Sequence, residues 1–140
     1  MAIEVILDSS IIVALVTLEE YSNWASESVQ EHGYCHILDL SFYEVANALR
    51  HKVSDRFSQK DAATAFRQAE KMMNLYAIHD FSGVIVDALN KALDFDITVY
   101  DAAFLSLVER LDMHLLTLDM KLAKKLERTK YCGLIECPNQ

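Results

Sequence analysis

Short apolar runs rich in β-branched residues alternate along the chain with longer segments in which apolar side chains recur every three or four positions. Such runs predict buried strands, and such segments predict helices. We expect strands at residues 3–7, 36–40, 75–78, 114–118 and 134–136. We expect helices at residues 11–18, 21–31, 41–52, 58–73, 81–93, 99–111 and 119–128. Because strands that alternate with helices pair in parallel, the pattern predicts an α/β fold with a central parallel sheet of four to five strands flanked by helices.

Several helix starts carry side chains that can accept hydrogen bonds from unpaired backbone N–H groups. Ser58, followed three residues later by Asp61, matches a capping box. Ser41 and Thr98 are expected to cap the helices that begin beside them. The helix after Thr98 is apolar nearly all round, which is typical of a buried helix.

The composition predicts a single globular domain spanning residues 1–140. Hydrophobic residues make up 52% of the chain and charged residues 24%, with three glycines and one proline. These values exclude a disordered or collagen-like protein. A domain of this size buries roughly 68% of its unfolded surface, so one core is sufficient.

The sequence gives no sign of export or of a membrane span. The apolar N-terminal segment lacks a basic start and carries Glu4 and Asp8, so we do not expect a signal peptide. A membrane helix needs about 18 consecutive apolar residues, and no such stretch occurs. The three cysteines form no CxxC pair, which suits a reducing compartment and gives no zinc signature. We therefore expect a cytoplasmic protein.

The formal net charge is −8, which disfavours tight non-specific binding of duplex DNA. Positive charge gathers near the end of the chain, at Lys121, Lys124, Lys125, Arg128 and Lys130. Transient docking of a short RNA is compatible with this distribution.

Asp8 and Asp119 each follow a predicted strand and precede a predicted helix. In open parallel sheets, ligands bind outside the carboxyl ends of the strands, which is where these two residues are expected. Either one alone could be an ordinary helix N-cap, because aspartate is a preferred capping residue.

Glu44 and Asp101 lie in the first turns of their predicted helices. Glu44 shares a helix face with Asn47 rather than with the apolar stripe, so a solvated position is the alternative interpretation. Asp101 heads the stripe that faces the core, where a carboxylate is costly unless something satisfies it. A capping box with Thr98 could satisfy it, and so could a metal ion. Asp94 and Asp96 are nearby, but neither precedes the buried stripe.

The four acids together point to a divalent cation. Two ionised carboxylates about 4 Å apart repel each other by roughly 4 kcal/mol at a surface-like dielectric. A cation removes that penalty, and Mg²⁺ prefers oxygen ligands and keeps several waters. Such an ion activates water for the cleavage of phosphodiester bonds.

Four segments in order resemble the PIN domain, the Mg²⁺-dependent ribonuclease fold of VapC-type toxins. They are "ILDSSIIVAL" at 6–15, "SFYEVANALR" at 41–50, "TVYDAAFLSLVERL" at 98–111 and "LLTLD" at 115–119. No single segment is specific, but their order and spacing agree over nearly the whole chain. The pattern departs slightly from the family at Phe104, where a tyrosine is usual, and in the absence of a glycine after residue 111.

The resemblance implies a three-layer fold, a homodimer, and cleavage of single-stranded RNA that leaves a 5′-phosphate. It implies that Asp8 and Asp101 bind Mg²⁺ directly, with Mn²⁺ as a possible substitute. It also implies that Glu44 and Asp119 bind the ion through water or position the nucleophile. A small antitoxin would inhibit such a toxin by inserting a side chain, such as that of arginine, toward the acids.

The resemblance also implies supporting roles for Ser10, Asn47 and Thr117, for which turn and capping chemistry is the alternative. Three other functions stay open from the sequence. One is an RNA-processing nuclease outside a toxin system, and another is a metal-stabilised interaction module without activity. The third is a Mg²⁺ phosphatase, although its aspartyl-phosphate type needs a second aspartate where this chain has Ser10.

Overall fold

Five parallel strands form the centre of the fold in this computed structural model, which describes residues 3–138. The strands are β1 (Glu4–Leu7), β2 (Tyr34–Leu38), β3 (Ala77–His79), β4 (Leu115–Leu116) and β5 (Ile135–Glu136). Their order across the sheet is β3-β2-β1-β4-β5, and every neighbouring pair is parallel. The α/β fold with a central parallel sheet is therefore confirmed.

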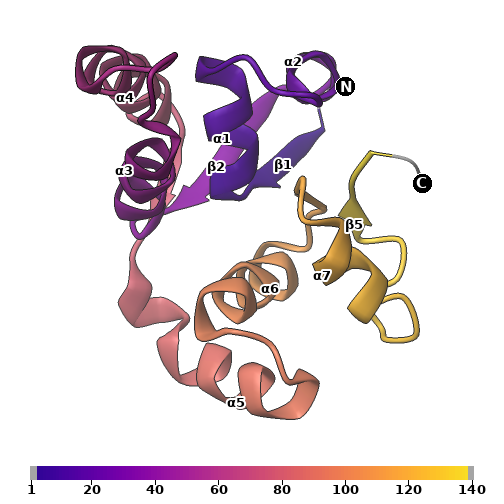
Figure 1. Ribbon diagram of the computed structural model, residues 1–140. Coiled ribbons are helices and arrows are strands. Elements are labelled where there is room, and N and C mark those ends of the chain that lie inside the picture. Colours follow the sequence, from indigo (N-terminus) through magenta and orange to yellow (C-terminus); the bar gives the residue numbers. More distant parts are fainter. Residues whose placement is uncertain (1–2, 139–140) are drawn as a thin grey trace.

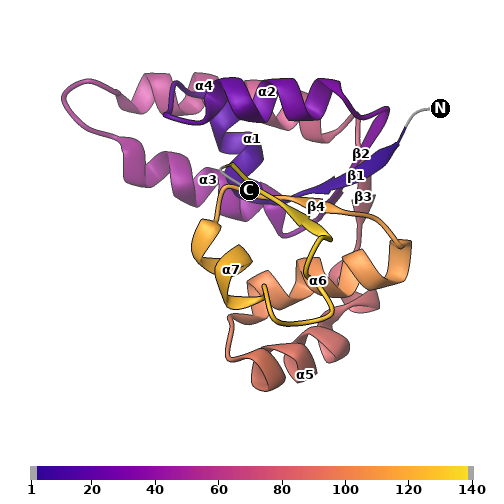
Figure 2. The ribbon, with the colours of Figure 1, turned by 90° about the vertical axis from the view of Figure 1, so that its right-hand side faces the viewer.

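Helices cover both faces of the sheet. They are α1 (Ser9–Val16), α2 (Ser22–Gln30), α3 (Ser41–Lys52), α4 (Gln59–Met73), α5 (Ile85–Phe95), α6 (Val99–Leu111) and α7 (Met120–Lys125), together with a 3-10 turn at Phe81–Gly83. Helices α1 to α4 lie on one face, and α5 to α7 lie on the other (Figures 1 and 2). Among residues 3–138, no helix has the length and the apolar content that crossing a bilayer requires.

Alternating side chains of β1 divide the core between these two faces. Val5 and Leu7 are fully buried in the core that contains α1, α3 and α4. Ile6 is fully buried in the opposite core, which contains α5 and α6. This alternation is the period of two that a strand buried on both sides requires. The alternation along β1 also determines the direction in which the next residue, Asp8, points.

The strand order reverses direction between β1 and β4. From β1 the chain moves outward through β2 and β3, then crosses back to place β4 on the other side of β1. In sheets of this type the crevice outside the carboxyl ends of the strands, at the reversal point, is the usual ligand site. Asp8 and Thr117 follow β1 and β4 directly, so both lie at this point.

Several predicted boundaries were wrong. The second strand begins at Tyr34, because the parallel register with Glu4 recruits residues before 36, and it ends at Leu38. Ser41 does not cap α3: the N-cap position belongs to Leu40, and the Ser41 hydroxyl is buried without a hydrogen-bond partner within residues 3–138. The third strand begins at residue 77 rather than 75, since Leu75 and Tyr76 still bond back to the end of α4.

The predicted helix at 81–93 is two elements. A 3-10 turn ends at Gly83, and α5 begins at Ile85 after the non-helical backbone of Val84. The Arg110 Nη1 atom donates to the Gly83 carbonyl at 3.1 Å, and a Cβ atom at Gly83 would lie 2.1 Å from that nitrogen. The helix predicted at 119–128 ends earlier, at Lys125, because the backbone turns there.

Candidate active site

The structure places all four predicted acids at N-terminal turns of helices. Asp8 is the N-cap of α1 and Asp119 is the N-cap of α7. Glu44 and Asp101 lie in the first turns of α3 and α6. Helix N-termini carry unpaired N–H groups and the positive end of the helix dipole, so they favour negative charge. We refer to Asp8, Glu44, Asp101 and Asp119 as the acid cluster.

Asp8 is held by two hydroxyls and by the backbone of α1. Its Oδ1 accepts hydrogen bonds from the Ser10 hydroxyl, from the Ser10 N–H at 3.0 Å and from the Ile11 N–H at 3.4 Å. Its Oδ2 accepts a short hydrogen bond from the Thr117 hydroxyl. The contact with Thr117 spans the point where the strand order reverses, because Leu7 and Leu116 are register partners. Asp8 is thereby fixed between two strands that are distant in the sequence.

The same two hydroxyls also order the loop that carries Asp119. The Leu118 N–H donates to the Ser10 hydroxyl at 2.9 Å, and the Asp119 N–H donates to the Thr117 hydroxyl at 3.0 Å. Asp119 in turn accepts from the Leu122 N–H at 3.0 Å and caps α7. Ser10 and Thr117 therefore connect one acid of the cluster to another.

A hydroxyl group lies beside each of the other two acids, from Ser9 at Glu44 and from Thr98 at Asp101. The Ser9 hydroxyl donates to Glu44 Oε1 at 2.6 Å and thereby joins α1 to α3. The Asp101 N–H donates to the Thr98 hydroxyl at 3.1 Å, so Thr98 caps α6 as predicted. Ser9 was missed by the sequence prediction, and its position beside Asp8 was the signal that could have identified it.

The carboxylates act on one another electrostatically. Burial raises the pKa of Asp8 to about 6, against the lowering effect of its hydroxyl and backbone hydrogen bonds, and the charge of Glu44 raises it further. Burial also raises the pKa of Glu44, with a contribution from the charge of Asp101. Burial raises the pKa of Asp101 as well, with a contribution from Asp119. The four acids thus form a continuous series in which each carboxylate lies close enough to repel the next.

Not every predicted residue joins this network. Asn47 is exposed and makes no hydrogen bond to the acid cluster within the described part of the chain; it lines a hollow with Glu44. Asp94 is exposed and outside the site. Asp96 lies closer than expected, since it lines the same hollow as Asp101, but its carboxylate faces Lys125 at 3.8 Å.

Open hollows adjoin the acid cluster. One of about 460 Å³ contains Asp101 and Asp119, and another of about 360 Å³ contains Glu44. A third, of about 530 Å³, contains none of the four acids but shares Ser9 and Ser10 with their hydrogen-bond network. Glu44, Asp101 and Asp119 therefore line hollows open to a polymer that lies across this edge of the sheet, whereas Asp8 lies beside the hollow that Ser9 and Ser10 line.

The donor set matches the preference of a hard cation. Across residues 3–138 no three His, Cys, Asp or Glu side chains already stand in a metal-binding arrangement. The side chains that meet here nevertheless present only oxygen atoms, and their charges repel one another. Oxygen ligands with excess negative charge are the environment that Mg²⁺ and Mn²⁺ prefer over softer metals.

Comparisons with known proteins agree with this architecture. Residues 5–127 match the family model described as "PIN domain". The chain is 36% identical over 123 residues to Ribonuclease VapC3 of Pyrobaculum aerophilum, which covers 87% of this chain and 94% of that protein.

Solved structures are similar as well. A crystal structure of PAE2754 from Pyrobaculum aerophilum is 28% identical, with a TM-score of 0.64, over 96% of this chain and 84% of the other. A toxin-antitoxin complex from Klebsiella pneumoniae is 12% identical and shares the fold, with a TM-score of 0.71 over 97% and 98% of the two chains. The sequence match, the shared fold and the order of the strands lead to one conclusion: the chain belongs to the PIN domain family.

Proposed function

We propose that this protein is a metal-dependent endoribonuclease that cleaves single-stranded RNA and is the toxin of a type II toxin–antitoxin pair. The observation that carries the proposal is the series of four carboxylates at the N-terminal turns of α1, α3, α6 and α7, in which each repels the next. Family membership supports a nuclease, because a relative that is 36% identical is named a ribonuclease.

Mg²⁺ is the proposed cofactor, and Mn²⁺ is its proposed substitute. In this proposal Asp8 and Asp101 bind the ion directly, while Glu44 and Asp119 bind it through water. When bound, such an ion activates water and neutralises charge on the phosphoryl oxygens. The raised pKa values support the assignment, since burial raises them most and the neighbouring acids add to it, and a cation would offset both effects.

The chain's own residues orient the reaction. Ser10 and Thr117 occupy both oxygens of Asp8 and hold its carboxylate in one orientation. Ser9 occupies Oε1 of Glu44, so we assign Oε2 to the water that attacks phosphorus. In the proposed step a bond forms between the water oxygen and phosphorus, the proton passes to Oε2, and the bond to the 3′-oxygen breaks. The products are a 5′-phosphate and a 3′-hydroxyl, and the 3′-oxygen takes a proton from solvent.

Lysine side chains near the acid cluster are the proposed contacts for RNA phosphates. Lys121 lines the same hollow as Asp101 and Asp119. Lys52 lines the hollow that contains Ser9, where it pairs with Glu19 at 2.5 Å. Arg50 and Lys124 are further candidates on the same two helices. Because the chain is acidic overall, these cations support transient rather than tight binding.

We further propose a small antitoxin, a second copy of the chain in a homodimer, and a cytoplasmic setting. Solved relatives of the same fold include a toxin-antitoxin complex, which supports the antitoxin. An odd number of cysteines without a CxxC pair suits the reducing cytoplasm. A basic side chain of the antitoxin would find the acid cluster complementary.

The test compares Asp8→Asn with the unchanged protein on labelled single-stranded RNA in the presence of Mg²⁺. We expect Asp8→Asn to lower the cleavage rate by at least about a hundredfold, because a metal ligand is lost. Asp94→Asn makes the same chemical change outside the site and should leave the rate within about twofold.

Equal cleavage by the Asp8→Asn and unchanged proteins would remove the proposed chemistry. A small phosphomonoester serves as the second substrate. Hydrolysis of that substrate without RNA cleavage would assign the site to a phosphatase instead. Inactivity of the unchanged protein on both substrates would favour an interaction module.

A further inference from the structure

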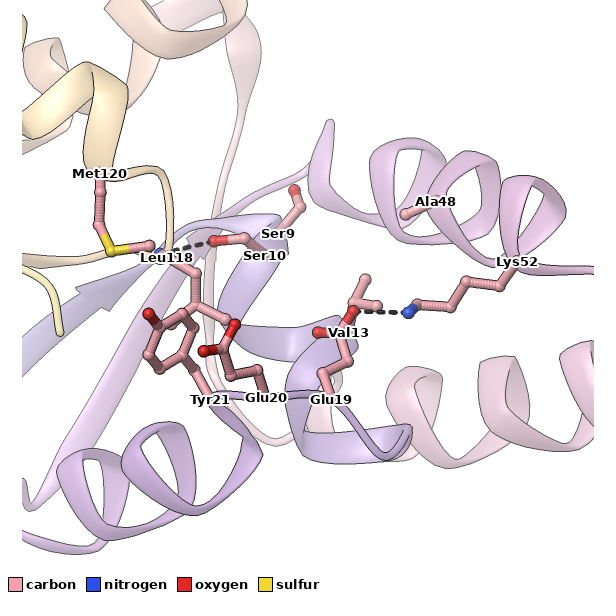
Figure 3. A pocket seen from close by; sticks show the side chains of 10 residues that line it. All are labelled: Ser9, Ser10, Val13, Glu19, Glu20, Tyr21, Ala48, Lys52, Leu118 and Met120. Atoms are coloured by element: carbon pink, nitrogen blue, oxygen red, sulfur yellow. Dashed lines mark hydrogen bonds and ion pairs between the residues drawn. The ribbon is translucent and has the colours of Figure 1, made fainter.

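The largest of the three hollows lies beside the acid cluster and has a different chemistry. Its volume is about 530 Å³, which is within the range of small-molecule sites. It is open to solvent and is lined by residues of α1, of the loop between α1 and α2, of α3 and of the segment after β4 (Figure 3). Ser9 and Ser10 form its edge and hydrogen-bond to Glu44 and Asp8. A nucleotide next to the scissile phosphate could therefore reach it. We refer to this hollow as the side pocket.

One wall of the side pocket is apolar and carries an aromatic ring. Val13, Ala48, Leu118 and Met120 supply aliphatic and thioether surface. The half-buried ring of Tyr21 lies below Leu118 and faces the same space (Figure 3). Flat heteroaromatic groups stack on such surfaces, and stacking on an aromatic side chain contributes to the binding of single-stranded nucleic acids.

Two carboxylates, Glu19 and Glu20, line the side pocket and differ in what they contact. Glu19 is engaged by Lys52 at 2.5 Å. Glu20 is exposed and lines the pocket, and its carboxylate lies beside the ring of Tyr21 (Figure 3). A carboxylate in this place repels a phosphate but accepts hydrogen bonds from N–H groups. The side of the pocket that carries Glu20 and Tyr21 thus fits a base, while Lys52, at the side of Glu19, remains the proposed contact for a phosphate.

We propose that the side pocket binds one unpaired base of the RNA substrate and selects guanine; this inference rests on the proposed ribonuclease function. The base stacks on Tyr21 against the apolar wall, and the Glu20 carboxylate accepts from its Watson–Crick edge. Guanine presents two adjacent donors there, N1–H and N2–H, which match the two oxygens of a carboxylate. Adenine, cytosine and uracil each place an acceptor next to their donor, and a carboxylate repels that acceptor.

The experiment measures kcat/KM for short single-stranded RNAs that carry each of the four bases in turn at the positions flanking the cleaved bond. For the unchanged protein we expect guanine at one flanking position to be preferred roughly tenfold or more, the discrimination typical of a bidentate contact. Glu20→Gln should reduce that preference to about threefold or less, because an amide offers one acceptor only. Glu31→Gln, a matched change of an exposed glutamate at the other end of α2, should keep it.

A second variant tests stacking. Tyr21→Leu should lower kcat/KM by roughly tenfold or more for all four bases, since stacking is tolerant of sequence. Melting curves of each variant show whether a loss reflects unfolding, and Glu20→Gln, at an exposed position, provides the test if Tyr21→Leu fails to fold.

The absolute rates of RNA cleavage test the proposed ribonuclease function, and the ratios of rates between bases test the role of the side pocket. If the unchanged protein cleaves no RNA, the proposed function fails. If it cleaves all four series equally, or if Glu20→Gln keeps the preference of the unchanged protein, the base-binding role of the side pocket is overturned while the nuclease function stands. A further outcome is that Glu20→Gln keeps the base preference but is inhibited more weakly by an antitoxin. This outcome would assign the pocket to the protein partner and would also overturn the inference.

Discussion

Asp8 shows how one residue can be both a helix cap and a group under electrostatic strain. As an N-cap it accepts from the backbone of α1, and hydrogen bonds of this kind stabilise the ionised form. Burial acts in the opposite direction and is the larger effect, so the pKa of Asp8 is raised from 3.8 to about 6. The fold therefore holds a carboxylate where its charge is unfavourable, and the proposed cation would compensate that charge.

This balance predicts a pH dependence of stability for the metal-free protein. Because the pKa is higher in the folded state than in the unfolded state, the contribution of Asp8 is fully present below about pH 4 and is lost as the pH rises through about 6. This rise in the pKa of Asp8 corresponds to a contribution of at most about 3 kcal/mol to the free energy of unfolding. Asp8→Asn carries no charge, so we expect it to be more stable than the unchanged protein at pH 7.5 and equal to it at pH 4.

Urea denaturation in the presence of a chelator, at pH 4 and at pH 7.5, measures the difference. Asp94→Asn is the control, because Asp94 is exposed and outside the cluster; its difference from the unchanged protein should not depend on pH. An Asp8→Asn variant that is less stable at pH 7.5 would show that the hydrogen bonds to Ser10 and Thr117 outweigh burial.

Residue types alone did not reveal how the acids are held. The four acids could be placed at one edge of the sheet because each follows a predicted strand or opens a predicted helix. The contact between Thr117 and Asp8 depends on the register of β1 against β4, which pairs residues more than a hundred positions apart and leaves no local signal. Ser9 was missed because a serine beside a capping aspartate is also typical of an ordinary helix start.

At the scale of elements, two helices offer a matched comparison of capping. Thr98 accepts from the Asp101 N–H at 3.1 Å at the start of α6, and Ser58 accepts from the Asp61 N–H at 3.0 Å at the start of α4. Thr98→Ala and Ser58→Ala should each cost about 1 kcal/mol of stability. Only Thr98→Ala should also reduce RNA cleavage, by roughly tenfold or more, because the displaced first turn of α6 carries Asp101.

Chemical denaturation gives the two stability changes, and the cleavage assay separates the two caps. Similar losses of activity in both variants would mean that general destabilisation, and not the position of Asp101, controls the rate. Unchanged activity in Thr98→Ala would mean that Asp101 is held by its surroundings without the cap.

The same comparison explains which element boundaries could be predicted. The caps at Ser58 and Thr98 were correct because the interacting partner lies three residues away in the sequence. Ser41 was wrong because α3 begins inside a tight connection after β2, where Asp39 bonds to His79 of the neighbouring strand. That bond joins residues forty positions apart, so no local pattern around Ser41 encodes it.

At the scale of the whole molecule, the two layers of helices present different surfaces. Within the layer formed by α5 to α7, α5 packs on α6 through Lys91, whose ammonium bonds to Asp87 and Glu109, both at 2.6 Å. Burial alone would lower the pKa of Lys91, but these two carboxylates raise it. The outer side of α5 is apolar and exposed: Val86 is 72% exposed and Leu93 is 74% exposed. Exposed apolar patches of this kind are typical of contact surfaces.

We expect a second copy of the chain to cover this side of α5. A single helix that carries aliphatic side chains along one side can pack against its own symmetry mate, because a twofold contact is self-complementary. The unchanged protein should therefore sediment at twice the 15.9 kDa mass of one chain. Leu89→Glu together with Leu93→Glu should give a monomer, since burying four like charges across one interface is strongly unfavourable.

Leu18→Glu is the control for this experiment, because Leu18 is also an exposed leucine but follows α1 in the opposite layer. It should leave the dimer intact in analytical ultracentrifugation. A monomeric unchanged protein would refute self-association, and dissociation by Leu18→Glu alone would move the interface to the layer of α1 to α4.

Because the acid cluster lies at the strand ends and not on the outer side of α5, the monomeric double variant should retain RNA cleavage if one chain supplies the complete site. Loss of cleavage with intact folding would show instead that the RNA is held between two chains.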